Sequence, residues 1–490
     1  MDSLSQEILL LIVPHLCHDP PNPNPQPWDS TSRLNIASYA TISRPWQHAI
    51  ERFTLASIHK YSSDLPTFHQ IFTNPRRRRM LRRLTYEIDL PSYSTNRIHC
   101  FERRRESKAN QVAFNQGIID LAIELATWDK QSLELTLLAS SPMDPGRRPG
   151  PENLDPELGS NRWMHENIYL SVIDSESVDI PELPCIRSLI IPNERRDIHP
   201  AAIGRLISAM PRLEKLRLDL NAPKPKNRSL QKDYRLALAS ALDSPSLSIL
   251  KSLYIYFEQS IPKNHSFPVQ EHDPDYPSGD ALNISIRNLC ETSPLSHLHL
   301  DGWWPVSPAL FAGRAPFPFL QNVKIEAALT TYDGRWFYTG NPDATDASYQ
   351  FGRFESDESS SDEDLDSNSS FNSEYEDYVR EGREALLNGD EPYYMWRTKP
   401  EAEMFDRFME DMARAMRRMH CLRDLSFSMG WNYHDDYAIL LEYTGSMGDG
   451  EEAGCWVRLR PEARWEIPEG FMKLLGECVG GNVEVCVEPF

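Results

Sequence analysis

Apolar residues recur with helical spacing at the start of the chain. Leu4, Ile8 and Ile12 are each four residues apart, and Leu16 continues the series, which places one apolar stripe on a helix. The segment DPPNPNPQP at 19–27 then ends this helix, because proline lacks an amide donor and disfavours helix in the residue before it. The pattern therefore predicts one short amphipathic helix followed by a proline-rich loop.

A second helical pattern covers residues 34–53, with the sequence LNIASYATISRPWQHAIERF. Pro45 divides this stretch, since proline is tolerated in the first turn of a helix and not in its interior. We expect one helix to end near Ser43 and the next to begin at Pro45. Residues 1–62 are accordingly predicted to form a small helical module.

The two halves of this module resemble an F-box. The first half reads L-S-x-E-I-L-x-x-I-x-x-x-L over Leu4–Leu16, and the second reads Y-A-T-I-S-R-x-W over Tyr39–Trp46. Ser5 stands where the family usually has proline, and Pro45 takes the variable position before the tryptophan. The resemblance implies docking onto the Skp-type adaptor of SCF ubiquitin ligases through a helical contact with exposed apolar anchors. It implies that seven apolar side chains form that interface or support it: Leu4, Ile8, Leu9, Ile12, Leu16, Ile42 and Trp46.

Beyond the module, a short apolar phrase of the form L-x-x-L-x-L recurs from about Arg76. The last two apolar positions of each phrase fall on one side of a strand, so each phrase predicts a strand that buries one face. Helical patterns separate several of them, for example at 201–210 and 281–290. The phrases begin at Leu81, Ile186, Leu213, Leu250, Leu295, Leu320 and Leu422.

A strand, a turn and a helix repeated along the chain are typical of leucine-rich repeats. We therefore predict an α/β chain: an N-terminal helical F-box-like module, then an irregular leucine-rich-repeat-like αβ solenoid with a disordered acidic insert. The solenoid is expected over 76–345 and a C-terminal repeat or cap over 393–490. An ordinary α/β domain with several buried strands is the alternative. Three phrases, RRLTYEIDLP, DGRWFYTGNPD and FMEDMARAMRRMHCLRDL, are also similar to families of F-box-domain proteins from filamentous fungi, over nearly the whole chain.

Charge changes this picture at one segment. The net charge of the 490 residues is −21, and Glu355–Asp377 holds ten acidic residues and no basic one. With few apolar side chains, this segment cannot offset its chain entropy, so residues 353–392 are predicted to be disordered. Ser359, Ser360 and Ser361 each precede an acid by three residues, which suits phosphorylation by an acidophilic kinase. The alternative is a solvated loop without a regulatory role.

Composition also excludes several classes of function. A net charge of −21 argues against general nucleic-acid binding, which needs a cationic face. The eight cysteines include no C-x-x-C pair, so neither a zinc ribbon nor a redox motif is expected. No apolar run reaches the ~18 residues of a membrane span, and the first residues lack a secretory pattern. We expect an intracellular protein, cytoplasmic or nuclear or both, with no catalytic residue, cofactor or metal ligand.

Two further clusters are candidates for contacts. Trp303 and Trp304 follow a predicted strand and are expected in a strand-to-helix loop, where they either contact a target protein or fill space under the loop. The segment Arg76–Arg83 contains six arginines, which fit a nuclear localisation signal, an anion-binding surface or a solvated approach to the first strand.

The sequence thus predicts a non-enzymatic adaptor. Its helical module would hold the Skp-type adaptor of a ubiquitin ligase, and its repeats would capture an unknown target protein. One alternative is a ligase-independent interaction scaffold, in which the module is vestigial and the repeats bind partners without ubiquitylation. In structural terms, the alternative to an F-box is a plain three-helix cap. Another is an unrecognised hydrolase, which requires a pocket with a converging nucleophile and base.

Overall fold

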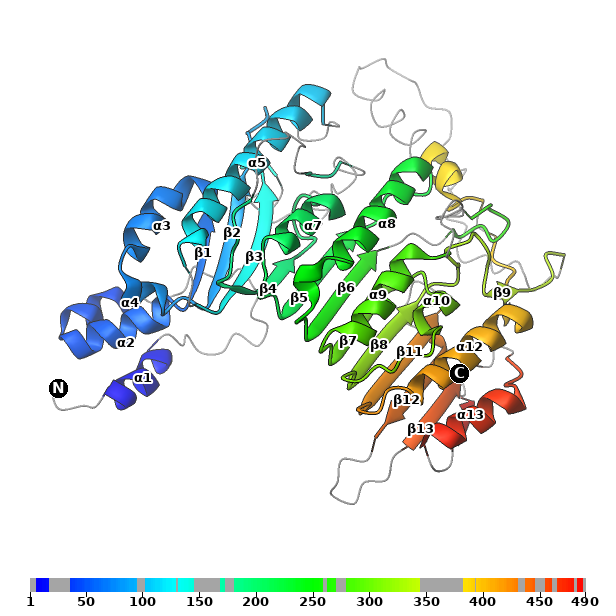
Figure 1. Cartoon of the computed structure of the whole chain (residues 1–490). Coiled ribbons are helices and arrows are strands. Elements are labelled where there is room, and N and C mark those ends of the chain that lie inside the picture. The colour runs from blue at the N-terminus through cyan, green and yellow to red at the C-terminus, as the bar shows by residue number, and fades with distance from the viewer. Residues whose placement is uncertain are drawn as a thin grey trace, which may run out of the picture. The chain divides into compact units, whose positions relative to one another are not determined.

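The structure is a computed structural model that divides into two compact units (Figure 1). The first comprises residues 1–165, 170–196 and 208–215, and the second comprises 166–169, 197–207 and 216–490. None of the helices that the structure describes is long and apolar enough to cross a membrane. The described residues are 6–16, 36–94, 102–128, 131–144, 168–171, 180–258, 262–269, 279–343, 382–392, 394–430, 437–445, 454–460, 465–479 and 483–487.

The first unit begins with the predicted helical module. Helix α1 covers Gln6–His15, a 3-10 helix η2 covers Ile36–Thr41, and α2 covers Arg44–Thr54. The predicted break before Pro45 is confirmed, because α2 begins at Arg44 with proline in its first turn. These helices share a small core of their own, made of Leu9, Val13, Ile36, Trp46, Ala49 and Ile50.

A parallel sheet follows the helices in the same unit. Its first strand lies within residues 1–62, which were predicted to belong to the helical module. Strand β1 starts at Ser57, whereas the sequence placed the first strand near Leu81. The strands lie in the order of the chain and each pair is parallel. They are β1 (Ser57–Tyr61), β2 (Arg83–Asp89), β3 (Leu133–Ser140) and β4 (Ile186–Ile191).

Helices cover one face of this sheet, the longest being α5 (Arg104–Ala126), with α3 (Leu65–Phe72) and α4 (Pro75–Arg78) before it (Figure 1). Gly117 allows α5 to approach β2 closely, since a Cβ there would lie 2.8 Å from the Ile88 side chain. The Tyr86 hydroxyl donates to the Gly117 carbonyl at 3.2 Å, which fixes the same contact.

The second unit repeats the strand–helix alternation. Its strands lie in the order β5-β6-β7-β8-β11-β12-β13-β14. The pairs from β6 to β11 are parallel, and β12 is antiparallel to both of its neighbours. The strands are β5 (Lys215–Asn221), β6 (Ser252–Glu258), β7 (His297–Trp304), β8 (Asn322–Ala327), β11 (Asp424–Gly430), β12 (Tyr437–Thr444), β13 (Gly454–Leu459) and β14 (Val483–Val487).

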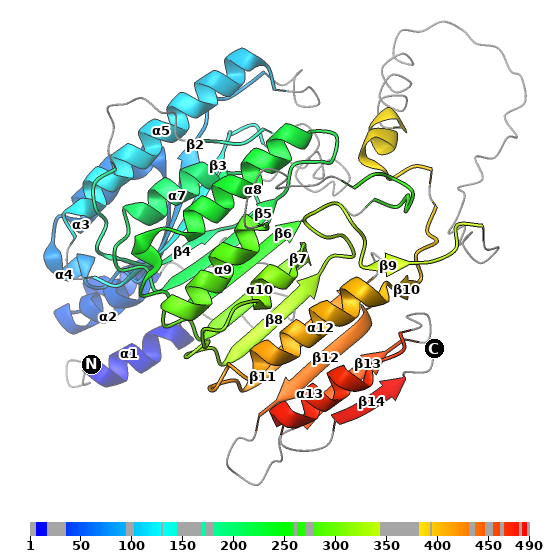
Figure 2. The ribbon, with the colours of Figure 1, turned by 45° about the vertical axis from the view of Figure 1, so that its right-hand side comes forward.

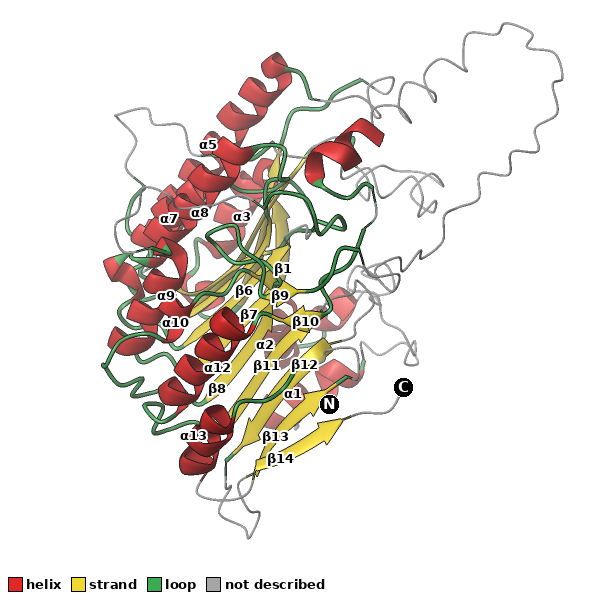
Figure 3. Ribbon diagram, turned by 90° about the vertical axis from the view of Figure 1, so that its right-hand side faces the viewer, coloured by secondary structure: helices red, strands yellow, loops and turns green. Residues whose placement is uncertain are grey.

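The helices of the second unit that alternate with these strands lie along one face of the strands, and none of them covers the opposite face (Figures 2 and 3). The stripe of α12 that faces the sheet is fully buried, including Phe405, Phe408 and Met412. The helices are α7 (Pro200–Ser208), α8 (Arg228–Leu242), α9 (Ala281–Thr292), α10 (Pro308–Phe311), α12 (Ala402–Met416) and α13 (Glu469–Val479). The short pair β9 (Tyr338–Thr339) and β10 (Lys399–Pro400) stands apart from the large sheet.

The predicted α/β class and the predicted strand phrases are confirmed. Each of the seven phrases overlaps a strand. Where the first apolar residue of a phrase precedes its strand, that residue is buried in every case but the last, in which Leu422 is half-buried. Leu213, Leu250 and Leu295 are examples, each with no exposed surface.

The acidic insert differs in part from the prediction. Residues 353–381, with Ser359, Ser360 and Ser361, lie outside the described residues. Residues 382–388 form a helix, although they were predicted to be disordered. Glu384 and Leu387 favour helix, and the N-terminal end of α8 anchors the segment. Lys226 binds there twice, with Nζ 2.8 Å from Glu384 Oε1 and its amide donating to Asn388 Oδ1 at 3.2 Å.

A buried histidine joins two segments of the second unit that are far apart in sequence. His265 is 1% exposed, and its Nδ1 accepts the amide hydrogens of Trp396 at 3.0 Å and Arg397 at 2.9 Å. Burial, aided by the nearby Arg397 guanidinium, lowers the pKa of His265 to about 3. The neutral ring is therefore the form that accepts both hydrogen bonds.

We expect this histidine to make the second unit acid-sensitive. Its pKa is about 3 in the folded chain and 6.5 when unperturbed, so a falling pH protonates the unfolded state first. Stability is fully present above pH 6.5 and is lost toward pH 3, by at most about 1.4 kcal/mol per pH unit. Urea unfolding followed by tryptophan fluorescence at pH 7.5, 6 and 5 measures this loss.

His265→Asn keeps an acceptor and removes the titration, so this variant should lose less stability between pH 7.5 and 5 than the wild type. His420→Asn, at an exposed position, is the matched control and should follow the wild type. Equal losses in the wild type and in His265→Asn would contradict the assignment.

Candidate functional site

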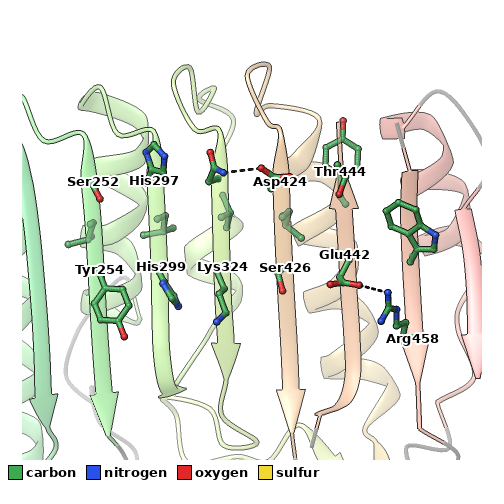
Figure 4. Close-up of a pocket in the computed structure, with 17 residues that line it drawn as sticks. Ser252, Tyr254, His297, His299, Lys324, Asp424, Ser426, Glu442, Thr444 and Arg458 are labelled. Carbon is green, nitrogen blue, oxygen red and sulfur yellow. Dashed lines mark hydrogen bonds and ion pairs between the residues drawn. The ribbon is translucent and has the colours of Figure 1, made fainter. Parts of the chain in front are cut away.

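The open face of the second unit carries a hollow of about 670 Å³ (Figure 4). Side chains alternate along each strand, so that Leu253 and Leu298 pack beneath the helices while Tyr254 and His299 point to the open face. The labelled lining residues in Figure 4 are Ser252, Tyr254, His297, His299, Lys324, Asp424, Ser426, Glu442, Thr444 and Arg458.

Strand register arranges these side chains in rows across the sheet. Each strand contributes one residue to a row because neighbouring partners lie directly opposite each other. The central row crosses six strands and consists of Tyr254, His299, Lys324, Ser426, Glu442 and Trp456. With strands ~4.8 Å apart, six strands span ~24 Å, the length of roughly seven residues of extended peptide.

Most charges around the hollow already have partners. Asn322 donates to Asp424 Oδ2 at 2.9 Å, and Arg458 lies 3.0 Å from Glu442 Oε2. The close approach of the His299 ring holds the pKa of Asp301 well below its usual range. His299 Nε2 and Asp301 Oδ2 are 3.2 Å apart.

Lys324 stands in the middle of the central row. It is exposed and has no hydrogen bond or ion pair within the part of the chain that the structure describes. Its ammonium group is therefore available to a carboxylate or another anionic group of a bound protein.

Aromatic side chains bound the row at both ends. Tyr254 lies on β6, where the Arg217 guanidinium stacks over its ring at 4.7 Å and His299 meets it edge-on at 4.5 Å. Trp456 lies on β13, and its indole ring packs directly over Gly454. Only glycine leaves room for the ring there, since a Cβ at position 454 would lie 2.2 Å from it. Such flat aromatic walls suit contact with a protein segment.

The described residues of the hollow give no sign of metal chemistry. Among the described residues, no group of three or more His, Cys, Asp or Glu side chains is placed to hold a metal ion.

In the first unit, His59 and Ser140 both contact Glu87, with His59 Nε2 2.9 Å from the carboxylate and the Ser140 hydroxyl donating to it. The carboxylate thus lies between serine and histidine, which differs from the order of a nucleophile, a base and an acid that orients the base.

The helical module exposes only some of its predicted contact residues. Ile8 and Ile42 are each 44% exposed, and Ile12 and Leu16 are half-buried against the core. Leu4 lies outside the described residues.

Leu9 and Trp46 occupy the core of the module at 1% and 7% exposure, so they can support a contact and cannot form it. The sequence reasoning missed three exposed apolar side chains: Leu11, Tyr39 and Phe53. Leu11 is the clearest, at 70% exposure, and its position off the apolar stripe was the available signal.

The predicted loop position of the two tryptophans is wrong, and burial excludes target contact as the role of Trp304, leaving the alternative that it fills internal space. Both tryptophans belong to β7 and not to a loop, and Trp304 is fully buried, with Nε1 donating to Asn283 Oδ1 at 3.0 Å. The cause is a shift of register after Leu300, where Gly302 and Trp303 adopt positive φ angles of 77° and 67° and turn the strand. Gly302 fits because a Cβ there would lie 2.8 Å from the Phe257 backbone. Trp303 stays partly exposed, so its contact with a target remains a prediction.

No protein-family model matches the chain, and none of the curated proteins is significantly similar to it.

Replacing each of the two adjacent tryptophans by alanine should change the free energy of unfolding by very different amounts. Trp304→Ala removes a fully buried ring and its hydrogen bond, so we expect a loss of about 3–5 kcal/mol in the free energy of unfolding. Trp303→Ala should lower it by less than about 1 kcal/mol, because that side chain is partly exposed. Urea denaturation of both variants gives the comparison, and similar losses would refute the assignment of Trp304 to the core.

Proposed function

We propose that this protein is a substrate-recognition adaptor of an SCF-type ubiquitin ligase. Helices α1, η2 and α2 bind the Skp-type adaptor as an F-box, and the open sheet face of the second unit receives a target protein. The observation that carries the first part is the exposed apolar surface that remains on the module after its own core is complete.

That surface is larger than the module's stability requires. Six side chains already fill the core, yet Leu11, Ile8 and Ile42 keep between 44% and 70% of their surface exposed. Exposed apolar side chains that cluster on a short element are typical of contact with a partner. The F-box-like pattern at Leu4–Leu16 and Tyr39–Trp46 names the class of partner.

The open sheet face supports the second part of the proposal. The strand–helix phrases favour an irregular leucine-rich-repeat-like αβ solenoid, an architecture that presents one row of strands to a ligand. The hollow on β6–β13 offers the unpaired Lys324 between Tyr254 and Trp456. A protein segment with an anionic side chain fits this arrangement better than a small cofactor, because the surface is long and open.

One observation favours the alternative of a ligase-independent scaffold. Arg77 Nη2 lies 2.7 Å from Glu51 Oε1 and so joins α4 to α2, and the amides of Arg82 and Arg83 donate to the Ala56 carbonyl just after α2. The module is thereby held against the start of the sheet, as a terminal cap would be. A cap accounts for these contacts and leaves the exposed Leu11 unexplained.

The deciding variant combines Ile8→Glu and Leu11→Glu, two exposed positions on α1. We expect binding to the purified Skp-type adaptor to weaken by roughly 30-fold or more, since two apolar anchors of a contact contribute ~1 kcal/mol or more each. Isothermal titration calorimetry measures the affinity, and circular dichroism checks that the helices persist.

Val112→Glu combined with Ile123→Glu changes two exposed apolar positions of α5 in the same unit and is the matched control. If folded wild-type protein does not bind the adaptor, or if the double variant binds as tightly as the wild type, the F-box assignment fails.

A charge reversal tests the target surface. Lys324→Glu should reduce ubiquitylation of a target identified by proximity labelling, because it replaces the unpaired cation of the central row. Lys473→Glu on α13 changes the same charge on an exposed helix and should have no effect. Equal ubiquitylation in the two variants would argue that the target binds elsewhere.

A further inference from the structure

The arginine-rich segment Arg76–Arg83 divides into structural and free side chains. Arg77 forms the ion pair with Glu51 that joins α4 to α2. Arg78 donates from Nε to the Phe72 carbonyl at 2.5 Å, and its guanidinium stacks over Trp128 at 5.3 Å. These two arginines hold the local fold together.

The other four arginines of the segment serve no such purpose. They are exposed and have no hydrogen bond or ion pair from their side chains to any residue that the structure describes. They are Arg76, Arg79, Arg82 and Arg83.

These side chains lie beside the helical module. The amides of Arg82 and Arg83 bind the Ala56 carbonyl, one turn beyond the exposed Arg52 of α2. Arg76 lies close enough to α2 that it and Arg52 both lower the pKa of His48, after the larger effect of burial. We call Arg52, Arg76, Arg79, Arg82 and Arg83 together the arginine surface.

The local fold argues against a nuclear localisation signal in this segment. A nuclear localisation signal is bound as an extended peptide, whereas Arg76–Arg78 lie within helix α4 and Arg83 begins strand β2. The amides of Arg77 and Arg78 are bonded to the Asn74 carbonyl. The arginines therefore act as a fixed surface of the folded unit.

The charge around this surface contrasts with that of the whole chain. Residues 44–83 contain nine arginines and lysines against two acidic residues, a net charge of +7 in a chain of −21. At physiological salt, charges interact over ~8 Å, so a short acidic segment of a protein senses mainly this local excess. A nucleic-acid duplex needs a longer cationic face than this one local segment supplies.

We propose that the arginine surface holds an acidic segment of the same protein partner that the helical module binds. This inference rests on the proposed function and adds a second feature of the partner, an acidic segment beside the part that contacts the apolar side chains of the module. Phe53 on α2 is 41% exposed and directly follows Arg52, so α2 presents an exposed apolar side chain next to the arginine surface.

The test uses the full chain with Arg76, Arg79 and Arg82 all replaced by glutamine. The control replaces the exposed Arg104, Arg105 and Lys108 of α5 by glutamine, which removes the same charge from another helix of the same unit. Arg77 and Arg78 stay in place, so the contacts of α4 are kept. Fluorescence anisotropy measures binding of a labelled octaglutamate peptide at low salt, and calorimetry measures binding of the Skp-type adaptor at two salt concentrations.

We expect the triple variant to bind octaglutamate and the adaptor roughly fivefold to tenfold more weakly than the wild type, as three exposed charge pairs allow. Its affinity for the adaptor should depend less on salt. The control variant should match the wild type in both assays.

The possible results separate this inference from the proposed function. Equal octaglutamate binding by the wild type and the triple variant overturns the inference, whatever the adaptor does. Selective octaglutamate binding without any adaptor binding supports acidic-segment recognition and overturns the F-box assignment. Equal adaptor affinity of the two proteins overturns the link to that partner. Tighter binding of an eight-nucleotide single strand than of octaglutamate would assign the surface to nucleic acid instead.

Discussion

The second unit depends on the burial of one face of each strand beneath the helices. Successive side chains of a strand point to opposite sides, so the packing of Leu253, Leu298 and Val323 beneath the helices leaves their neighbours on the open face. Parallel register then brings those neighbours into rows. The hollow on β6–β13 is thus a product of the same alternation that forms the core, and a slip of one residue would exchange the two faces.

Much of this arrangement follows from the sequence because the alternation is local. The apolar phrases located seven strands, and the proline at position 45 located the break between two helices. Strand order and register depend on packing between distant segments, so the sequence did not show that Tyr254, Lys324 and Trp456 share a row. The unpaired state of Lys324 was hidden for the same reason.

The errors have specific causes. Trp304 was placed in a loop, with its role left open, because nothing in the letters DGWW shows that Gly302 and Trp303 turn the strand and direct the next side chain inward. Leu9 and Leu11 are both leucines and differ only in the side of α1 on which they lie, yet Leu9 belongs to the core and Leu11 is 70% exposed. The helix at 382–388 depends on its contacts with Lys226, which lies far away in sequence.

The contacts of His265 also bear on how the chain folds. Its imidazole meets the Trp396 and Arg397 amides across separations of 131 and 132 residues, so β7 and β8 lie within the loop that these contacts close. Contacts of such high order form slowly, because the chain must give up the entropy of that loop. The cost grows only with the logarithm of loop length, by ~0.6 kcal/mol for each doubling. Because α9, β7 and β8 lie inside this loop and pack into the core, only an insertion or deletion outside these elements leaves the closure cost nearly unchanged.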